Sequence, residues 1–296
     1  MLINKLSKQD FITVIAPSSN LTAKNKEDID KSVIACQKLG LKVKISKHAY
    51  SIVSDISEKI EDLEIAFKDK ETKAILCAKG GAFCKYLIDK IDYQIIKENP
   101  KIFGGVSDAT FLLNSIYAKT GLITFHMSDF KHLYMQEYNI NCLKEMFINN
   151  NLKINPNTRW RTLKPGLGRG TLIGGNLTCL TMLSETDYFP KDKKIILFLE
   201  EVQSASSKKG IIQNIDKLKQ KNIFDKVKGL LIADYTNDSN IKFEDIILNE
   251  LSEYNFPIVK CHDFGHNKIN CILPIGSKVT LDGFKSKLII EENIFK

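Results

Sequence analysis

Residues 101–110 read KIFGGVSDAT, and residues 111–117 continue as FLLNSIY. The first segment begins with an apolar run, as in a buried strand, and reaches Ser107 through a Gly-Gly-Val turn. In the second segment, apolar residues recur at the three- and four-residue spacing of a packed helix face. The stretch therefore predicts a strand, a tight turn that carries Ser107, and a helix.

Ser107 has two interpretations at this turn. A serine between a strand and a helix lies at the positive end of the helix, where backbone N–H groups can stabilise the oxyanion that forms when it acts as a nucleophile. Serine and aspartate are also favoured helix N-caps, and a cap needs no chemistry. The segment lacks the second glycine of the G-x-S-x-G motif, so it leaves both interpretations open.

The residues before this stretch form repeated strand–helix units, which predict a parallel sheet flanked by helices. In open sheets of this kind, binding sites form at the carboxyl ends of the strands. Ser19, Gly80-Gly81 and Ser107 all fall at such ends. The predicted strands are residues 11–16, 41–45 and 74–78, and the predicted helices are residues 26–39 and 56–68, with a further helix around Tyr86 and Leu87.

The second half of the chain has a different composition. Residues 149–157 are polar and turn-rich, and residues 164–170 are dense in glycine. The Gly-x-Gly-x-Gly run there does not follow a strand of a strand–helix unit, so we interpret it as a turn or linker and not as a phosphate loop. We predict an N-terminal α/β domain over residues 1–150, a linker over 151–170 and a smaller C-terminal domain over 171–296.

The C-terminal domain is expected to be mixed α/β with more β character. Residues 194–201 are predicted to form a buried strand that ends in two carboxylates, Glu200 and Glu201. The other predicted elements are helices at 177–183 and 210–219, a strand at 227–234, and short strands around Ile258, Ile272-Leu273 and 279–281.

Composition argues against several classes of protein. The chain has 296 residues, of which 43% are hydrophobic, enough to fill a sizeable core. Its formal charge of +8 comes from lysines that are mixed with Glu and Asp, without an arginine-rich block, so we expect no nucleic-acid partner. The sequence shows neither a signal-peptide pattern nor an apolar run long enough to span a membrane, so no membrane association is expected.

Cysteine and histidine usage argues against metal chemistry. The seven cysteines are scattered without C-x-x-C spacing, which favours reduced thiols in a cytoplasmic protein. The five histidines form no cluster with the spacing of metal ligands. We therefore expect no metal and no cofactor.

A serine nucleophile needs a base within hydrogen-bond reach and an acid that orients the base. The candidate bases are His266, in a loop between two apolar segments, His126 after a hydrophobic strand, and His48 near a strand end. His132 and His262 lack comparable glycine neighbours. Glu200 and Glu201 are equally good orienting acids on spacing alone. Spacing does not choose among these residues.

Six segments of the chain, in one order and with similar spacing, resemble the LD-carboxypeptidase family of serine peptidases. That family includes muramoyltetrapeptide carboxypeptidases and microcin C self-immunity peptidases. The segments are residues 15–19 (IAPSS), Lys79-Gly80-Gly81 with Ile91-Asp92-Tyr93, residues 99–110, residues 172–177 (LIGGNL), residues 197–202 (LFLEEV), and Phe264-Gly265-His266 followed by residues 273–276 (LPIG).

The resemblance implies a Ser-Glu-His triad. Ser107 matches the nucleophile of the family's Gly-Tyr-Ser-Asp motif, Glu200 the first acid of its Leu-Glu-Asp/Glu motif, and His266 the histidine of its Phe-Gly-His motif. The oxyanion hole would consist of backbone N–H groups of Gly80-Gly81 and Asp108, so Asp108 is expected to matter through its N–H and not its carboxylate.

By the same resemblance, the protein is expected to be a cytoplasmic homodimer that hydrolyses the L,D amide bond of murein tetrapeptides and releases terminal D-alanine in cell-wall recycling. The alternatives are a self-immunity peptidase that cleaves peptidyl- or aminoacyl-nucleotides, and a non-catalytic binding relative. A further interpretation, a flavodoxin-like nucleotide binder, would need a phosphate loop at a strand end, and Gly80-Gly81 is too short for one.

Three motifs depart from the family's pattern, and all three border the expected cleft. The family usually has Arg-Gly-Gly-Tyr-Gly where this chain reads KGGAF at residues 79–83. Its His-Gly-Pro becomes His-Met-Ser at residues 126–128, and Val106 replaces the common tyrosine before the nucleophile. These changes affect the expected identity of the substrate more than the triad chemistry.

Overall fold

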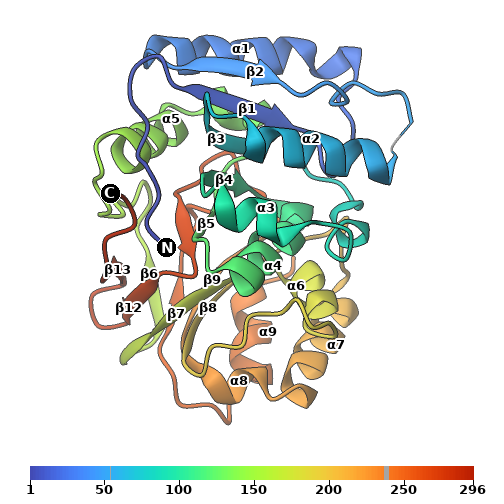
Figure 1. The fold of residues 1–296 in the computed structure, drawn as a ribbon. Coiled ribbons are helices and arrows are strands. Elements are labelled where there is room, and N and C mark those ends of the chain that lie inside the picture. The colour runs from blue at the N-terminus through green and yellow to red at the C-terminus, as the bar shows by residue number, and fades with distance from the viewer. Residues whose placement is uncertain (54, 237–239) are drawn as a thin grey trace.

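The structure of the protein, a computed structural model, describes residues 1–53, 55–236 and 240–296. Two sheets form its framework, and Figure 1 shows them in the upper and lower halves of the molecule with helices packed around them. Each sheet contains a run of parallel strands joined through helices. The predicted fold class is confirmed.

The first sheet holds the predicted strand–helix units. Its strands are β1 (Phe11–Ile15), β2 (Lys42–Ile45), β3 (Thr72–Cys77), β4 (Ile102–Gly105), β5 (Thr124–His126) and β11 (Leu273–Ile275). Its helices are α1 (Lys26–Lys38), α2 (Ile56–Lys68), α3 (Tyr93–Glu98), α4 (Thr110–Thr120) and α5 (Glu137–Leu143), and shorter helical segments are η1 (Ala23–Asn25), η2 (Cys84–Tyr86), η3 (Ser107–Ala109), η4 (Phe130–Met135) and η5 (Lys144–Ile148). The strand order is β11-β5-β4-β3-β1-β2, with β11 antiparallel to β5.

The second sheet has the order β13-β12-β7-β8-β9-β10-β6. Strands β7 to β10 are parallel, and β6, β12 and β13 pair in the antiparallel sense. The strands are β6 (Arg161–Lys164), β7 (Leu167–Asn176), β8 (Ile195–Val202), β9 (Val227–Thr236), β10 (Ile258–Lys260), β12 (Lys278–Asp282) and β13 (Lys287–Ile290). The helices are α6 (Leu177–Leu183), α7 (Lys208–Gln220), α8 (Ile223–Lys226) and α9 (Phe243–Glu250).

The second sheet begins inside the segment that we predicted as a linker, residues 151–170. Strand β6 and the first residues of β7 lie there, and the Gly-x-Gly-x-Gly run leads into and forms the start of β7. A side chain at Gly170 would stand 2.7 Å from the carbonyl oxygen of Lys194 on the neighbouring chain segment. The glycines therefore permit close strand packing, which a turn interpretation overlooked.

The two halves of the chain are joined by more than this segment. Residues 261–272 run from the end of β10 in the second sheet to the start of β11 in the first. Leu273 pairs with His126, so β11 begins at the carboxyl end of β5. The loop that contains His266 thus crosses from one sheet to the other at the edge where the parallel strands of the first sheet end.

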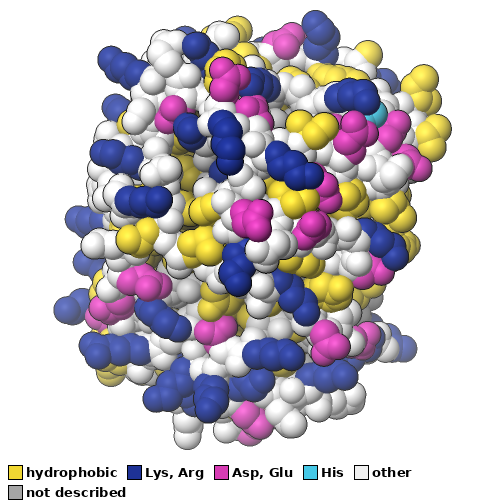
Figure 2. All heavy atoms as spheres, in the orientation of Figure 1, with side chains coloured by type: hydrophobic (Ala, Val, Ile, Leu, Met, Phe, Trp, Pro, Cys, Tyr) yellow, Lys and Arg dark blue, Asp and Glu magenta, His cyan; other side chains and the backbone are white. Residues whose placement is uncertain are grey.

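The core is apolar and continuous across both sheets. Aromatic contacts tie distant parts of the chain together, such as Phe125 against Phe147 with ring centroids 4.8 Å apart. On the face shown in Figure 2, basic side chains are interspersed with acidic and apolar ones. None of the helices in the described residues is long and apolar enough to cross a membrane.

Candidate active site

Ser107 follows β4 directly and has a left-handed backbone conformation, with φ of 64°. This conformation costs a non-glycine residue on the order of 1–3 kcal/mol and persists only where the surrounding structure enforces it. Val106, and not Ser107, occupies the N-cap position of η3, and Ser107 caps no helix with its side chain. The cap interpretation of Ser107 is therefore wrong for this structure.

Two glycines leave room for the serine. A Cβ at Gly80 would stand 2.9 Å from Cβ and 3.0 Å from Oγ of Ser107. A Cβ at Gly105 would stand 2.9 Å from the side chains of both Ala109 and Cys77. Any larger residue at either position would displace the turn, because real Cβ atoms do not approach other atoms so closely.

His266 lies against Ser107 and connects it to Glu200. Its Nε2 is 2.9 Å from Oγ of Ser107, and its Nδ1 is 2.6 Å from Oε2 of Glu200. The His266 side chain is one-quarter exposed, whereas that of Glu200 is fully buried at the end of β8. A Cβ at Gly265, whose φ is +93°, would stand 2.8 Å from Cβ of Glu200. Glycine is thus required beside the histidine, both because φ is positive there and because a side chain would clash with Glu200.

The two ionisable groups of this pair stabilise each other's charged forms. Burial alone would raise the pKa of Glu200, but the charge and hydrogen bond of His266 outweigh it and hold that pKa below its ordinary value. Burial alone would lower the pKa of His266, but the charge and hydrogen bond of Glu200 outweigh it and raise that pKa. Glu200 is therefore ionised at neutral pH and available to orient His266.

The other acid candidate, Glu201, faces the opposite side of β8, as adjacent strand residues must. Its carboxylate accepts hydrogen bonds from Nδ2 of Asn176 at 2.8 Å, and from the backbone N and Oγ1 of Thr178 at 3.0 and 2.6 Å. Burial and the neighbouring charge of Glu200 raise its pKa. These contacts fix the start of α6 and leave Glu201 away from His266.

The other base candidates do not contact Ser107. His126 is fully buried between Phe198 and Phe264, with ring centroids 5.2 and 5.9 Å away, and burial lowers its pKa to about 4. His48 is paired with Glu61 beside α2. Within the described residues, neither histidine has a hydrogen bond to the serine.

Asp108 has a structural role that we did not predict. Its carboxylate accepts hydrogen bonds from Oγ of Ser18 and from the backbone N–H groups of Phe83 and Cys84, the last two at 2.8 Å. The carboxylate thereby holds the loops after β1 and β3 against η3. The expectation that Asp108 matters for its N–H and not its carboxylate was wrong in its second half.

The backbone N–H groups of Gly80, Gly81 and Asp108 remain available. No hydrogen bond within the described part of the chain uses any of the three as a donor. Gly80 contacts the serine side chain closely, and Asp108 follows the serine in sequence. Unpaired N–H groups at such positions suit an anion that forms beside Ser107.

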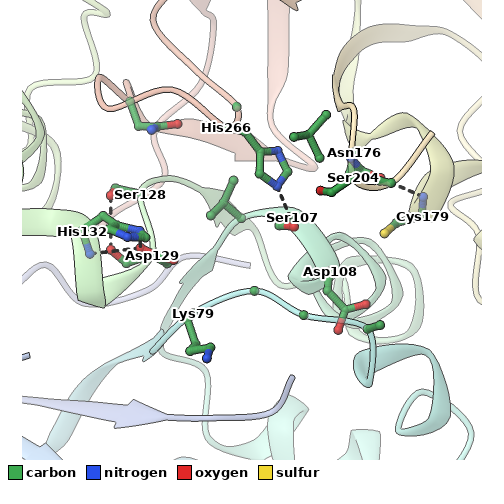
Figure 3. Close-up of a pocket in the computed structure, with 18 of the residues that line it drawn as sticks. Lys79, Ser107, Asp108, Ser128, Asp129, His132, Asn176, Cys179, Ser204 and His266 are labelled. Carbon is green, nitrogen blue, oxygen red and sulfur yellow. Dashed lines mark hydrogen bonds and ion pairs between the residues drawn. The ribbon is translucent and has the colours of Figure 1, made fainter. Parts of the chain in front are cut away.

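These residues line a cleft of about 800 Å³ between the two halves of the chain. In Figure 3, Lys79 and the group of Ser128, Asp129 and His132 lie on one side of Ser107 and His266, and Asn176, Cys179 and Ser204 lie on the other. A buried carboxylate, an imidazole and a hydroxyl in series can activate the hydroxyl for attack on an acyl carbon.

Sequence reasoning missed several cleft residues. His132 and Asp129 form a pair, with Nδ1 of His132 2.7 Å from Oδ1 of Asp129. The spacing of three residues directly after β5 is a signal that could have identified this pair. Nothing in the sequence pattern pointed to Asn176, Cys179 or Ser204, because their place in the cleft depends on how the two sheets meet.

Among the residues that the structure describes, no group of three or more His, Cys, Asp or Glu side chains could hold a metal ion. All seven cysteines are free thiols. Cys179 lines the cleft, but burial raises the pKa of its thiol well above the ordinary value. It is therefore a poor nucleophile at neutral pH.

Comparison with known proteins gives a consistent result. Residues 12–127 match a family model described as the LD-carboxypeptidase N-terminal domain, and residues 169–281 match the LD-carboxypeptidase C-terminal domain. The chain is 29% identical to a probable murein peptide carboxypeptidase of Bacillus subtilis, over 98% of this chain and 94% of that protein.

Two further similarities concern a second group within these proteins. The chain is 26% identical to the microcin C7 self-immunity protein MccF of Escherichia coli, over 99% of this chain and 96% of that protein. The crystal structure of an MccF-like protein from Bacillus anthracis superposes with a TM-score of 0.89 at 31% identity, covering 99% of this chain and 100% of the other.

Proposed function

Because the chain belongs to the LD-carboxypeptidase family, we propose that it is a serine peptidase that hydrolyses the amide bond between an L-centre and a terminal D-residue. The proposed substrate is a murein tetrapeptide, and the released product is D-alanine. The observation that carries this proposal is the hydrogen-bonded series of Glu200, His266 and Ser107 inside a substrate-sized cleft.

In the proposed first step, Oγ of Ser107 attacks the carbonyl carbon of the terminal amide. Nε2 of His266, 2.9 Å away, takes the hydroxyl proton and then donates it to the departing amine. Glu200 holds Nδ1 and stabilises the imidazolium that forms in between. The step leaves an acyl-serine ester and free D-alanine.

The negative charge that develops on the carbonyl oxygen needs donors in place before the reaction. We assign this role to the free N–H groups of Gly80, Gly81 and Asp108. Removing one such donor from an oxyanion hole typically costs about 10²–10³ in rate. The carboxylate of Asp108 supports the same site indirectly, because it fixes the loop that continues from Gly81.

Water completes the proposed cycle. With His266 as base, a water molecule attacks the acyl-serine ester, and Ser107 departs with the proton that His266 returns. The left-handed backbone of Ser107 in a tight turn places its hydroxyl 2.9 Å from Nε2 of His266, so the same histidine can serve both steps.

The test is a product assay. Purified protein is incubated with a disaccharide tetrapeptide, and tripeptide and free D-alanine are measured by mass spectrometry. We expect turnover by the wild type and none above background by Ser107→Ala. Release of D-alanine by Ser107→Ala at the wild-type rate would show that Ser107 is not the nucleophile.

A second candidate function is the cleavage of peptidyl- or aminoacyl-nucleotides. The similarity to the MccF proteins favours it, since it extends over nearly the whole chain. The chemistry at Ser107 would be the same, and only the leaving fragment would differ. Consumption of an aminoacyl-nucleotide analogue, without turnover of any murein peptide, would select this function.

A non-catalytic binding relative would need no ordered triad. The contacts of 2.6 and 2.9 Å between Glu200, His266 and Ser107 argue against that alternative. We further propose a cytoplasmic homodimer, as the resemblance implies. Light scattering coupled to size exclusion tests the dimer, and cell fractionation tests the location.

A further inference from the structure

Four lysines that line the cleft have no carboxylate partner. They are Lys79, Lys85, Lys131 and Lys268, and within the described residues none of them forms an ion pair. Lys85 lies over the ring of Tyr86, 4.8 Å from its centroid. An unpaired ammonium group that faces a partly enclosed cleft attracts anions more strongly than one in open solvent.

The carboxylates of the cleft do not neutralise these lysines. Asp108 is buried and accepts three hydrogen bonds from its own surroundings. Asp129 is nearly buried, and its carboxylate contacts both the backbone N–H and the ring Nδ1 of His132. The cleft therefore presents excess positive charge to whatever enters it.

Lys79 and Lys131 start from a common point in the backbone. The N–H of Lys131 donates a 3.0 Å hydrogen bond to the carbonyl oxygen of Ala78, the residue before Lys79. Both lysines line the cleft, so two unpaired positive charges enter the same cavity. An anion bound there would offset the repulsion between them.

His132 lines the cleft beside Lys131. Asp129 holds its Nδ1 at 2.7 Å, so Nδ1 bears a hydrogen and the orientation of the ring is fixed. We call Lys79, Lys131 and His132 the cation cluster. Figure 3 places Lys79 and His132 on the same side of the Ser107–His266 contact.

The cation cluster borders the reacting serine. Strand β4, which leads to Ser107, lies between β3, which leads to Lys79, and β5, which leads to residues 127–132. Gly80, the neighbour of Lys79, contacts the side chain of Ser107. In a substrate with a terminal D-residue, the free carboxylate is only two bonds from the amide nitrogen that leaves.

The other side of the cleft carries less of this positive charge, with Lys85 near Cys179. Asn176, Cys179 and Ser204 are neutral, and they lie across Ser107 from the cation cluster in Figure 3. Neutral amide and hydroxyl groups suit the peptide portion that stays on the serine. This asymmetry gives the substrate one favoured direction in the cleft.

Resting on the proposed function, we propose that the cation cluster binds the negatively charged group of the leaving fragment, and that this group is the C-terminal carboxylate of the D-residue. Lys79 and Lys131 supply the charge, and His132, held in place by Asp129, forms the cleft wall beside them. The cluster restricts the enzyme to the last residue of a peptide, because an internal residue has no carboxylate to offer.

The test compares a tetrapeptide that ends in D-alanine with the same peptide that ends in D-alaninamide. We expect wild-type kcat/KM to favour the acid by roughly 10- to 100-fold, as for hydrogen bonds to a charged group. Lys79→Met and Lys131→Met should raise KM for the acid more than for the amide and so reduce this preference toward one.

Lys85→Met is the matched control, because Lys85 lines the same cleft near Cys179, across Ser107 from the cluster. It should keep the preference for the acid. The ratio is measured within each variant, so a loss of folded protein cancels. A preference for the acid that survives Lys79→Met combined with Lys131→Met would overturn the proposal.

Binding separates this inference from the proposed function. Calorimetric titration of Ser107→Ala with the acid and the amide needs no turnover. Tighter binding of the acid that is lost in the two lysine variants supports the cluster. If wild type hydrolyses neither peptide, only the proposed function is rejected. Equal affinities, or no binding of either peptide, would overturn the cluster.

Titration with AMP tests whether the cluster binds a phosphoryl group or a carboxylate. Phosphate and carboxylate groups both suit paired ammonium groups. If AMP binding depends on Lys79 and Lys131 while acid and amide peptides bind alike, the cluster serves a phosphoryl group and the carboxylate assignment is wrong. Competition between AMP and the acid peptide, with both lost in the lysine variants, agrees with the assignment.

Discussion

The cleft contains two carboxylate–histidine pairs that resemble each other closely in geometry. Glu200 holds Nδ1 of His266 at 2.6 Å, and Asp129 holds Nδ1 of His132 at 2.7 Å. The first pair joins residues from different parts of the chain. The second pair is local, with a spacing of three residues at the start of η4.

The two pairs differ in what surrounds them. Glu200 is fully buried, and Nε2 of His266 meets the hydroxyl of Ser107. The side chain of His132 is 40% exposed, and within the described residues its Nε2 meets no nucleophile. A carboxylate–histidine pair is therefore not enough for catalysis, since a nucleophile within reach of Nε2 decides its role.

The largest expected difference between the pairs is in turnover. His266→Gln should lower kcat by at least about 10³-fold, because it removes the base that takes the serine proton. His132→Gln should change kcat little and should raise KM for the acid peptide. Steady-state kinetics of both variants measure this contrast, and comparable losses of kcat would break it.

A second contrast concerns the acids. Glu200→Gln keeps the shape of the side chain but removes the charge that stabilises the imidazolium, so we expect kcat to fall by about 10³-fold. Asp129→Asn should lower kcat far less. If the two substitutions prove equal in kcat, with circular dichroism showing both variants folded, then the contact of His266 with Ser107 is not what separates the pairs.

A smaller effect is expected from crowding at the first pair. Gly265→Ala introduces both strain at φ +93° and a clash with Glu200, and should lower the free energy of unfolding by about 2–4 kcal/mol. Gly121→Ala is the matched control, because Gly121 has φ +73° and open space around it. Denaturant unfolding gives both values, and equal losses would show that strain alone accounts for the effect.

The smallest contrast is in pH dependence. His266 must be neutral to act as base, so kcat/KM should fall as pH falls through its pKa. Because Glu200 raises that pKa, the acid limb should lie above the ordinary value of 6.5. Residual activity of Glu200→Gln should show the limb at lower pH, whereas Asp129→Asn should shift it less. An acid limb below 6.5 in wild type would contradict the assignment.

Local patterns predicted most of the first sheet. Helix α2 begins and ends where periodicity placed it, at Ile56 and Lys68, since one apolar face and a capping aspartate define both the helix and its start. The predicted helix around Tyr86 is only the short turn η2. Its apolar residues are few, and the carboxylate of Asp108 fixes the turn by contacts that sequence spacing does not reveal.

The site was predictable only in part, for a physical reason. The strand-end turn at Ser107 follows from local pattern, but His266 and Glu200 meet it across long stretches of chain. Family resemblance selected these two residues where spacing could not. The pair of Asp129 and His132 went unnoticed because its importance comes from the cleft wall on which it lies.

Strand β11 has a consequence for how the protein is made. It completes the first sheet by pairing Leu273 with His126, and the loop just before it contains His266. At synthesis rates of about 5–20 residues per second, β5 waits on the order of ten seconds for this partner. During that time the nascent chain has an open sheet edge, so a ribosome-bound chain without its last segments lacks both a closed sheet and the histidine opposite Ser107.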